Sequence, residues 1–230
     1  MSHPNKSPRV PLLCYVTDRR GLFSAKGQES SGILHQKMAA ALAAGVDWIQ
    51  IREKDLSGRA SSVLTREAVE VLRDSTAGNR VGPRILVNDR LDVALTAQAG
   101  GLHLGEHSLP TKEARRLAKS LQREKDFLIG VSCHSLDAAK NAEQNGADYL
   151  FFGPVFATPA KANYGAPQGL ERLAEVCRAV RVPVLAIGGI TLENAAACLS
   201  AGAMGIAAIR LFQDAPDLIG VVATVKKLSP

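Results

Sequence analysis

Apolar residues gather in short runs along the chain, and segments with a helical spacing of apolar positions separate these runs. Eight runs are almost continuously apolar, which is typical of strands in a parallel sheet that is buried on both faces. These runs cover residues 12–16, 48–51, 85–87, 102–104, 127–131, 149–152, 184–187 and 206–209. The helical segments cover residues 33–44, 60–74, 91–98, 111–122, 136–145, 170–180, 192–201 and 216–227. This alternation predicts an α/β fold, a single (β/α)8 TIM barrel.

Length and composition agree with one barrel. The chain has 230 residues, and a compact barrel of this type needs about 200 residues or slightly more. We therefore expect a flexible tail at residues 1–10 and a barrel domain at residues 11–230. Aromatic residues make up only 4% of the chain against 46% hydrophobic residues. The core is therefore expected to be aliphatic, as barrel interiors usually are.

Signals at the ends of the helical segments support these boundaries. Thr111, Ser135 and Thr191 stand where N-caps are expected, since their side-chain oxygens can accept hydrogen bonds from unpaired backbone N–H groups. A weak repeat also places a glycine before every second apolar run, at positions 45, 100, 146 and 202. Each glycine can end a helix in the left-handed conformation and turn the chain into the next strand.

The net charge of +6 is typical of a soluble basic enzyme surface. The alternative is that the substrates are small phosphorylated molecules, because a positive field concentrates anions. The Lys and Arg residues are dispersed and no basic run is interleaved with aromatic residues, so we expect no nucleic-acid partner. No stretch reaches the ~18 apolar residues of a membrane span, so no membrane partner is expected either. The four cysteines lack CxxC spacing, which favours reduced thiols in the cytoplasm. Assembly into a homo-oligomer stays open.

Polar residues suited to phosphate chemistry follow several of the apolar runs. In a TIM barrel the carboxyl ends of all strands meet at one rim, where the catalytic groups lie. Gln50, Arg52 and Lys54 alternate at the end of the second run, so their side chains are expected on one side of the strand. Two cations and an amide together indicate a phosphate or pyrophosphate site, with arginine able to form a bidentate contact. The alternative is a solvated strand end.

Further candidates follow the third, seventh and eighth runs. Asp89, beside Asn88, is a hard oxygen ligand suited to Mg²⁺, or alternatively a cap for the helix expected from residue 91. Gly188 and Gly189 follow the seventh run and Arg210 the eighth. Loops at these two places in TIM barrels often bind a phosphate through backbone N–H groups.

The motifs together resemble a known family. They are CYVTD at 14–18, QIREK at 50–54, NDR at 88–90, HLG at 103–105, GVSCH at 130–134, GPVFAT at 153–158 with Lys161, and AIGGI at 186–190. In this order and spacing, from about residue 12 to residue 213, the chain resembles thiamine phosphate synthase. The same superfamily includes a thiazole tautomerase of the same fold.

The resemblance implies a reaction and roles for the residues. The synthase joins hydroxymethylpyrimidine pyrophosphate to thiazole phosphate, which gives thiamine phosphate and pyrophosphate in thiamine biosynthesis. By motif, the residues that would bind the pyrophosphate are Gln50, Arg52, Lys54, Asn88, Ser132 and Lys161. Asp89 would hold Mg²⁺. The residues that would bind the thiazole phosphate are Thr158, Gly188, Gly189 and Ile209.

The chain departs from the family pattern at several of these positions. The second Mg²⁺ carboxylate of the family falls on Ser108, and the glutamine after the strand-four glycine is Glu106. A second threonine before the lysine is Ala160, and a strand-eight serine is Arg210. We expect Arg210 either to contact the thiazole phosphate or to turn outward and pair with Asp214 or another surface acid.

Two alternative functions remain open from the sequence. His134 stands where the tautomerase places a histidine that could move a proton, so a thiazole tautomerase is the second hypothesis. The other interpretation of His134 is that it fixes the loop after strand five. A non-catalytic barrel that binds phosphorylated ligands, and has lost its second metal carboxylate, is the third hypothesis.

Overall fold

The computed structural model describes residues 10–22, 30–75, 82–123, 125–158 and 166–228. Eight parallel strands close into a barrel in chain order, with β8 paired to β1. The strands are β1 Leu12–Val16, β2 Trp48–Ile51, β3 Arg84–Asn88, β4 Gly101–Leu104, β5 Leu128–Cys133, β6 Tyr149–Phe152, β7 Val184–Ile187 and β8 Gly205–Ala208. The predicted (β/α)8 barrel is confirmed, and the tail predicted at residues 1–10 lies outside the described residues except for Val10.

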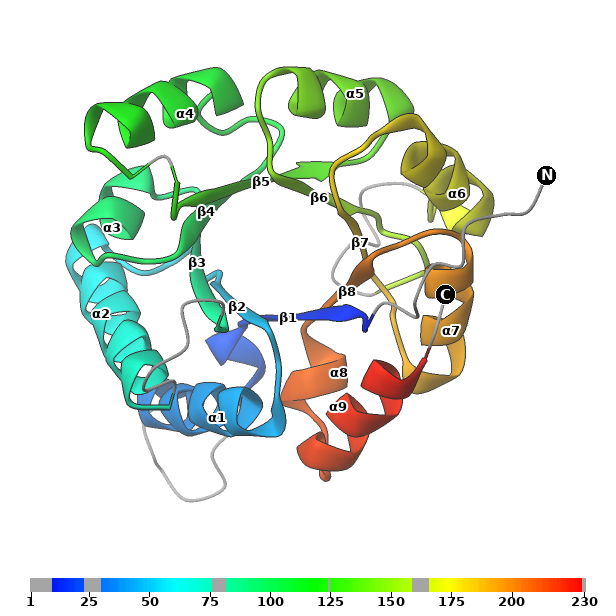
Figure 1. Ribbon diagram of the computed structural model, residues 1–230. Coiled ribbons are helices and arrows are strands. Elements are labelled where there is room, and N and C mark those ends of the chain that lie inside the picture. Colours follow the sequence, from blue (N-terminus) through cyan, green and yellow to red (C-terminus); the bar gives the residue numbers. More distant parts are fainter. Residues whose placement is uncertain (1–9, 23–29, 76–81, 124, 159–165, 229–230) are drawn as a thin grey trace.

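Helices surround the barrel on all sides (Figure 1). They are η1 Arg19–Gly21, α1 Ser30–Ala44, α2 Gly58–Ser75, α3 Leu91–Thr96, α4 Thr111–Ser120, α5 Leu136–Gln144, α6 Gly169–Ala179, α7 Leu192–Ser200, α8 Arg210–Gln213 and α9 Leu218–Lys227. Ser135 caps α5 by accepting from Ala138 N at 3.1 Å, and Thr191 forms a capping box with Asn194, as predicted. The prediction that Thr111 caps α4 is wrong, because Thr111 is already the first residue of this helix and Pro110 occupies the N-cap position.

Helix α8 was not predicted. The eighth apolar run was expected to continue to residue 209, but β8 ends at Ala208 and Ile209 precedes the short helix α8. Gln213 of α8 is buried: its Oε1 accepts from the Tyr15 hydroxyl at 2.9 Å and from Asp18 N at 3.2 Å. These bonds hold α8 against the end of β1, together with the buried Phe212 ring, whose centroid lies 6.3 Å from that of Tyr15.

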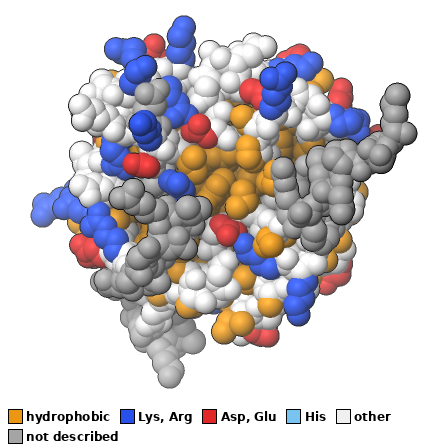
Figure 2. Space-filling view, in the orientation of Figure 1, with side chains coloured by type: hydrophobic (Ala, Val, Ile, Leu, Met, Phe, Trp, Pro, Cys, Tyr) orange, Lys and Arg blue, Asp and Glu red, His pale blue; other side chains and the backbone are white. Residues whose placement is uncertain are grey.

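Buried side chains form two separate apolar layers, because successive residues of a strand point to opposite faces. The larger layer lies between the strands and the helices, and the smaller one fills the barrel. The buried members of the inner layer are Cys14, Val16, Trp48, Leu86, Tyr149, Phe151, Leu185 and Ala207. Figure 2 shows apolar side chains at the centre of the ring, with charged side chains mostly around them.

The barrel interior is more aromatic than the composition indicated. The rings of Trp48 and Tyr149 lie 4.8 Å apart, and those of Tyr149 and Phe151 lie 5.5 Å apart. A few aromatic residues are concentrated in one place, which a chain-wide percentage does not show. Gly130 makes room for them, since a Cβ there would lie 2.0 Å from the Tyr149 ring.

The repeated glycines act largely as predicted. Gly45, Gly146 and Gly202 have φ of 95°, 90° and 102°, the left-handed conformation that glycine adopts without steric cost. The prediction was wrong at Gly100, where Gln98 takes the positive φ instead, at 55°. The turn after α3 therefore ends two residues earlier than the repeat suggested.

Aspartates that follow two of these glycines fasten the strands to one another. Asp47 Oδ2 accepts from Leu13 N at 2.7 Å and from Lys226 Nζ at 2.5 Å. Asp148 Oδ2 likewise accepts from Ile129 N at 2.7 Å and from Arg115. In both cases the carboxylate pairs a backbone N–H of the preceding strand, which would otherwise be left without an acceptor.

We expect Asp47→Ala to lower the free energy of unfolding by about 1–3 kcal/mol, because the N–H of fully buried Leu13 loses its acceptor. Urea denaturation measures this loss. Asp47→Asn is the matched control: it keeps an acceptor oxygen and should lose clearly less. Equal losses in the two variants would mean that the ion pair with Lys226, and not the bond to the backbone, stabilises this end of the barrel.

Candidate active site

Amide and carboxylate groups meet at the ends of β2 and β3. Gln50 is only 1% exposed, and its Nε2 donates to Asn88 Oδ1 at 2.9 Å. Asn88 Nδ2 donates in turn to Asp89 Oδ2 at 2.7 Å. The three side chains therefore form one hydrogen-bonded series that runs from the barrel interior to its rim, as expected for residues that end neighbouring parallel strands.

Asp89 is held in an unusual backbone conformation. Its φ is 62°, in the left-handed region, where aspartate is one of the few non-glycine residues found regularly. Its Oδ1 accepts from the Ser108 hydroxyl and from Gly105 N, the latter at 3.3 Å. Arg90, not Asp89, stands at the N-cap of α3. The alternative that Asp89 caps this helix is therefore wrong, and its carboxylate faces the loop after β4.

The groups around Asp89 suit a magnesium ion. Mg²⁺ commonly binds proteins through one or two carboxylates and completes its shell with water and substrate phosphates. Asp89 supplies one carboxylate, and the Ser108 hydroxyl beside it supplies a neutral oxygen. Within the described ranges, no three His, Cys, Asp or Glu side chains gather closely enough to hold a metal ion. The donor set therefore fits Mg²⁺ that also binds a phosphorylated substrate, with a single protein carboxylate.

Arg52 and Lys54 lie in the loop after β2, because this strand ends at Ile51. The predicted strand alternation therefore does not extend to these two residues. Lys54 is exposed and, together with Asn88 and Asp89, lines a hollow of about 250 Å³. The remaining lining residues are Ile51, Glu53, Leu56, Ser61 and Arg90. The structure thus brings Lys54 to the same hollow as the polar groups that follow β3.

Glu53 is a site residue for which the sequence interpretation had no role. Its carboxylate is buried, and its Oε1 accepts from the Thr17 hydroxyl at 2.6 Å and from Arg19 N at 3.1 Å. Thr17 Oγ1 accepts from Arg52 N at 3.0 Å. Glu53 therefore ties the end of β1 to the backbone of Arg52. The sequence held no signal for this role, because Glu53 lies beyond the end of β2 and strand alternation does not predict its direction.

His103 and Ser132 continue the polar layer inside the barrel. His103 Nε2 lies 2.9 Å from Ser132 Oγ, and its Nδ1 lies 3.0 Å from the Tyr149 hydroxyl. Burial lowers the pKa of His103 to about 3; the Asp89 charge opposes this shift and the Arg52 charge adds to it. The imidazole is therefore neutral at physiological pH and cannot act as a cationic phosphate ligand.

The loops after β6 and β7 pack closely on one another. Gly188 and Gly189 have φ of 96° and 67°. A Cβ at Gly188 would lie 2.5 Å from Pro154 Cβ, and one at Gly189 would lie 2.6 Å from Ala157 O. Only glycines fit this approach, which brings the Gly188–Gly189 turn next to the segment that leads to Thr158.

Comparison with known proteins identifies the family. The model of the family described as thiamine monophosphate synthase matches residues 22–212. The chain belongs to the thiamine monophosphate synthase family. It is 42% identical over 215 residues to the thiamine-phosphate synthase of Methanocella arvoryzae, with 93% of each chain covered. It is 42% identical over 188 residues to that of Moorella thermoacetica, with 82% of this chain and 84% of the relative covered.

Comparison with a solved structure agrees with membership of the thiamine monophosphate synthase family. The thiamine phosphate pyrophosphorylase of Pyrococcus furiosus superimposes with a TM-score of 0.76 at 32% sequence identity, and 94% of each chain is covered. Among the described residues, no helix of this family member is both long enough and apolar enough to cross a membrane.

Not every residue predicted from the family pattern is placed by the structure. Lys161 and Ala160 lie outside the described residues. Ile209 packs against the barrel interior, whereas Arg210 is exposed at the start of α8 rather than at the end of a strand. Arg210 forms no ion pair with a carboxylate in the described part of the chain. The alternative of an ion pair with Asp214 or another acid is therefore wrong for the described residues.

The side chain of His134 contacts the backbone at the end of the neighbouring strand. Its Nδ1 bonds to the Gly153 carbonyl, which joins the loop after β5 to the end of β6. This agrees with the interpretation that His134 fixes the loop.

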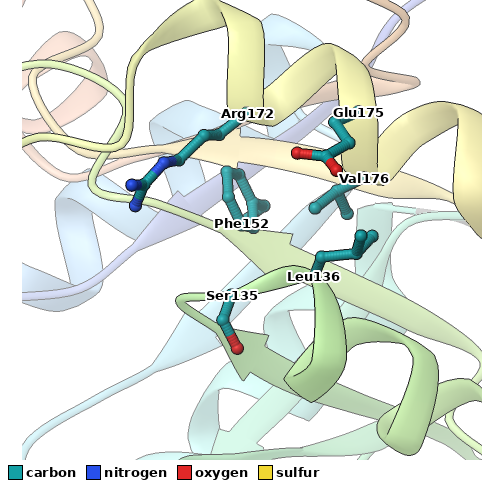
Figure 3. A pocket seen from close by; sticks show the side chains of 6 residues that line it. All are labelled: Ser135, Leu136, Phe152, Arg172, Glu175 and Val176. Carbon is teal, nitrogen blue, oxygen red and sulfur yellow. The ribbon is translucent and has the colours of Figure 1, made fainter.

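A second hollow lies away from these residues, between α5 and α6 (Figure 3). It measures about 200 Å³ and is lined by Ser135, Leu136, Phe152, Arg172, Glu175 and Val176. None of these residues belongs to the motifs that resemble the family, and Arg172 bonds to Gln168 at 2.9 Å. The candidate site of this thiamine monophosphate synthase family member is therefore the rim of the barrel and not this hollow.

We expect Glu53→Gln to change how stability depends on pH. Burial raises the pKa of Glu53, although Thr17 and Arg19 oppose the shift. The folded protein therefore holds this proton to higher pH than the unfolded chain, and the resulting stability is lost as pH rises through the folded-state pKa. The free energy of unfolding of the wild type minus that of the variant should therefore fall as pH rises above about 4.3, the ordinary pKa of a glutamate.

Urea denaturation at each pH measures this difference, and the other carboxylates cancel because both proteins contain them. A difference that grows with pH would show that hydrogen bonding outweighs burial at Glu53.

Proposed function

We propose that the protein is a thiamine-phosphate synthase, which condenses hydroxymethylpyrimidine pyrophosphate with thiazole phosphate and releases pyrophosphate. The observation that carries the proposal is the series Gln50–Asn88–Asp89, which ends at the hollow lined by Lys54. Relatives that are 42% identical and of similar length carry this activity in their names.

The reaction needs charge stabilisation more than a nucleophile from the protein. The bond between the pyrimidine methylene carbon and the pyrophosphate oxygen breaks, and the thiazole nitrogen forms a bond to the same carbon. Negative charge then develops on the leaving pyrophosphate, where preorganised donors and cations stabilise it. We assign this role to Arg52, Lys54 and Lys161. Burial raises the pKa of the nearby Cys133 thiol to about 12, so it is no candidate nucleophile.

Neutral groups complete the proposed pyrophosphate site. Gln50 and Asn88 present amide N–H groups at the strand ends, and Ser132 presents a hydroxyl from β5. Asp89 would hold Mg²⁺, with Ser108 as a neutral partner, and the ion would offset the charge of the pyrophosphate. Hydrogen bonds to Gly105 and Ser108 hold the Asp89 carboxylate in place for this purpose.

The thiazole phosphate would bind on the opposite side of the rim. Backbone groups of Gly188, Gly189 and Ile209 would donate to it, and Thr158 would face it from the loop after β6. Arg210 is exposed, and no carboxylate of the described residues pairs with it. This leaves its guanidinium available for a charge-assisted contact with the phosphate.

A cytoplasmic location is part of the proposal. Cys14, Cys133, Cys177 and Cys198 are all unpaired thiols. Unpaired thiols are usual in the reducing cytosol, where phosphorylated substrates are also formed.

The test is turnover of both substrates with Mg²⁺, followed by pyrophosphate release and by chromatography of thiamine phosphate. We expect both products, and a loss of at least about tenfold in kcat/KM for Lys54→Met, because a charged contact to the leaving group disappears. Lys226→Met, at the opposite end of the barrel, is the matched control and should keep its activity. Interconversion of thiazole carboxylate phosphate tautomers without pyrophosphate release would instead support the tautomerase hypothesis, and binding with neither reaction would support the non-catalytic barrel.

We expect Ser108→Asp to strengthen Mg²⁺ binding. The hydroxyl of Ser108 already touches Asp89 Oδ1, so the variant places a second carboxylate beside the first. Without metal the two charges repel and Tm should fall, whereas Mg²⁺ should raise Tm more than it does in the wild type. The Mg²⁺ concentration needed for half-maximal turnover should also fall.

Ser108→Asn is the control, since it adds similar bulk without charge. If the asparagine variant responds to Mg²⁺ as strongly as the aspartate variant, charge at position 108 does not govern metal binding.

A further inference from the structure

Three polar side chains cross the barrel interior in one series: the Tyr149 hydroxyl, the His103 ring and the Ser132 hydroxyl. Tyr149 and His103 are each 1% exposed, and their neighbours are mainly rings: His103 lies 4.2 Å from Phe151 and 5.5 Å from Tyr149 between centroids. Tyr149 and His103 take no part in the site proposed above. Ser132, at the end of the series, is the group proposed to meet the pyrophosphate.

The ring of His103 is neutral, so one nitrogen donates and the other accepts. Two arrangements are therefore conceivable. In the first, Nδ1–H donates to the Tyr149 oxygen and Nε2 accepts from the Ser132 hydroxyl. In the second, the Tyr149 hydroxyl donates to Nδ1, and Nε2–H donates to Ser132 Oγ.

Hydrogen-bond satisfaction separates the two arrangements. Within the described part of the chain, the Tyr149 hydroxyl has no partner other than His103. In the first arrangement its proton is buried without an acceptor, which is costly in an apolar interior. In the second arrangement the two donors inside the barrel, the Tyr149 hydroxyl and Nε2–H, both have acceptors, and only the hydroxyl proton of the half-buried Ser132 is left without one. The second arrangement is therefore the stable one, and it makes Nε2 the protonated nitrogen.

This choice decides what Ser132 can do. With Nε2–H donating to its oxygen, the Ser132 hydroxyl keeps its own proton for another partner. In the first arrangement that proton would be used by the ring, and Ser132 could only accept. Pyrophosphate oxygens are acceptors, so only the second arrangement gives Ser132 a favourable contact with them.

We propose that Tyr149 and His103 are positioning residues that hold His103 as its Nε2–H tautomer and thereby present Ser132 as a hydrogen-bond donor to pyrophosphate. The proposal rests on the function proposed above. Close packing keeps the series in place, because Gly130 lets the Tyr149 ring approach the backbone of β5. The partners at both ring nitrogens are uncharged hydroxyls, and the charges that act on His103, from Asp89 and Arg52, oppose each other.

The first test reads the tautomer directly. Nitrogen NMR of protein labelled at histidine should show His103 with a protonated Nε2 and an unprotonated Nδ1. A protonated Nδ1 would overturn the proposal, whatever the activity of the enzyme.

The second test measures the affinity for inorganic pyrophosphate with Mg²⁺ by calorimetry. Tyr149→Phe keeps the ring but removes the donor to Nδ1, so affinity should fall about tenfold, and KM for the pyrimidine pyrophosphate should rise while KM for thiazole phosphate stays unchanged. Tyr15→Phe is the matched control, since it also removes one buried hydroxyl, which bonds to Gln213 instead. This control should lose stability but not pyrophosphate affinity.

A double variant separates positioning from general disturbance of the site. With Ser132→Ala already present, Tyr149→Phe should cause no further loss, because no hydroxyl remains to be oriented. An additional loss in that background, or wild-type affinity in Tyr149→Phe alone, would overturn the inference while leaving the proposed function intact. A wild-type protein that neither binds nor releases pyrophosphate would overturn both.

Discussion

Closure of the barrel is the constraint on which the site depends. An eight-stranded barrel has an interior just wide enough for side chains to fill it, so residues that point inward at one level must contact one another. In this chain the lower levels are apolar and aromatic, and the upper level is polar. Gln50, Asn88, His103 and Ser132 come from four different strands, yet each finds its partner because closure leaves no other space for it.

The barrel and much of its rim could be predicted from the sequence. Continuous apolar runs indicated the strands, and the polar residues at their ends indicated that Gln50 and Asp89 belong to the site at one rim. Their meeting follows from topology, since neighbouring parallel strands end at the same edge. The family motifs added roles, but they did not show that Asp89 adopts a left-handed backbone or that Ser108 contacts it.

The contacts that could not be predicted are side-chain hydrogen bonds between residues that lie far apart in the sequence. Glu53 bonds to Thr17, 36 residues earlier, and His103 bonds to Tyr149, 46 residues later. Sequence periodicity predicts the side of a strand on which a side chain lies. Several distant residues lie on the same side, so periodicity does not predict which of them will be the hydrogen-bond partner. Helix α8 was missed for a related reason. It has only four residues, too few to show a helical spacing of apolar positions, and contacts of Phe212 and Gln213 with the distant Tyr15 hold it in place.

The aspartates that follow Gly45 and Gly146 have a consequence for how the protein tolerates change. Asp47 and Asp148 join strands where β2 and β6 begin, at the end of the barrel opposite the proposed site. Bonds that resist unfolding and groups that bind substrate are therefore separated by the length of the strands. Loops at the rim can therefore carry substitutions such as serine at 108 or arginine at 210 without weakening the hydrogen bonds that these two aspartates accept. Substitutions at the rim can thus change substrate specificity while the hydrogen bonds of Asp47 and Asp148 stay intact.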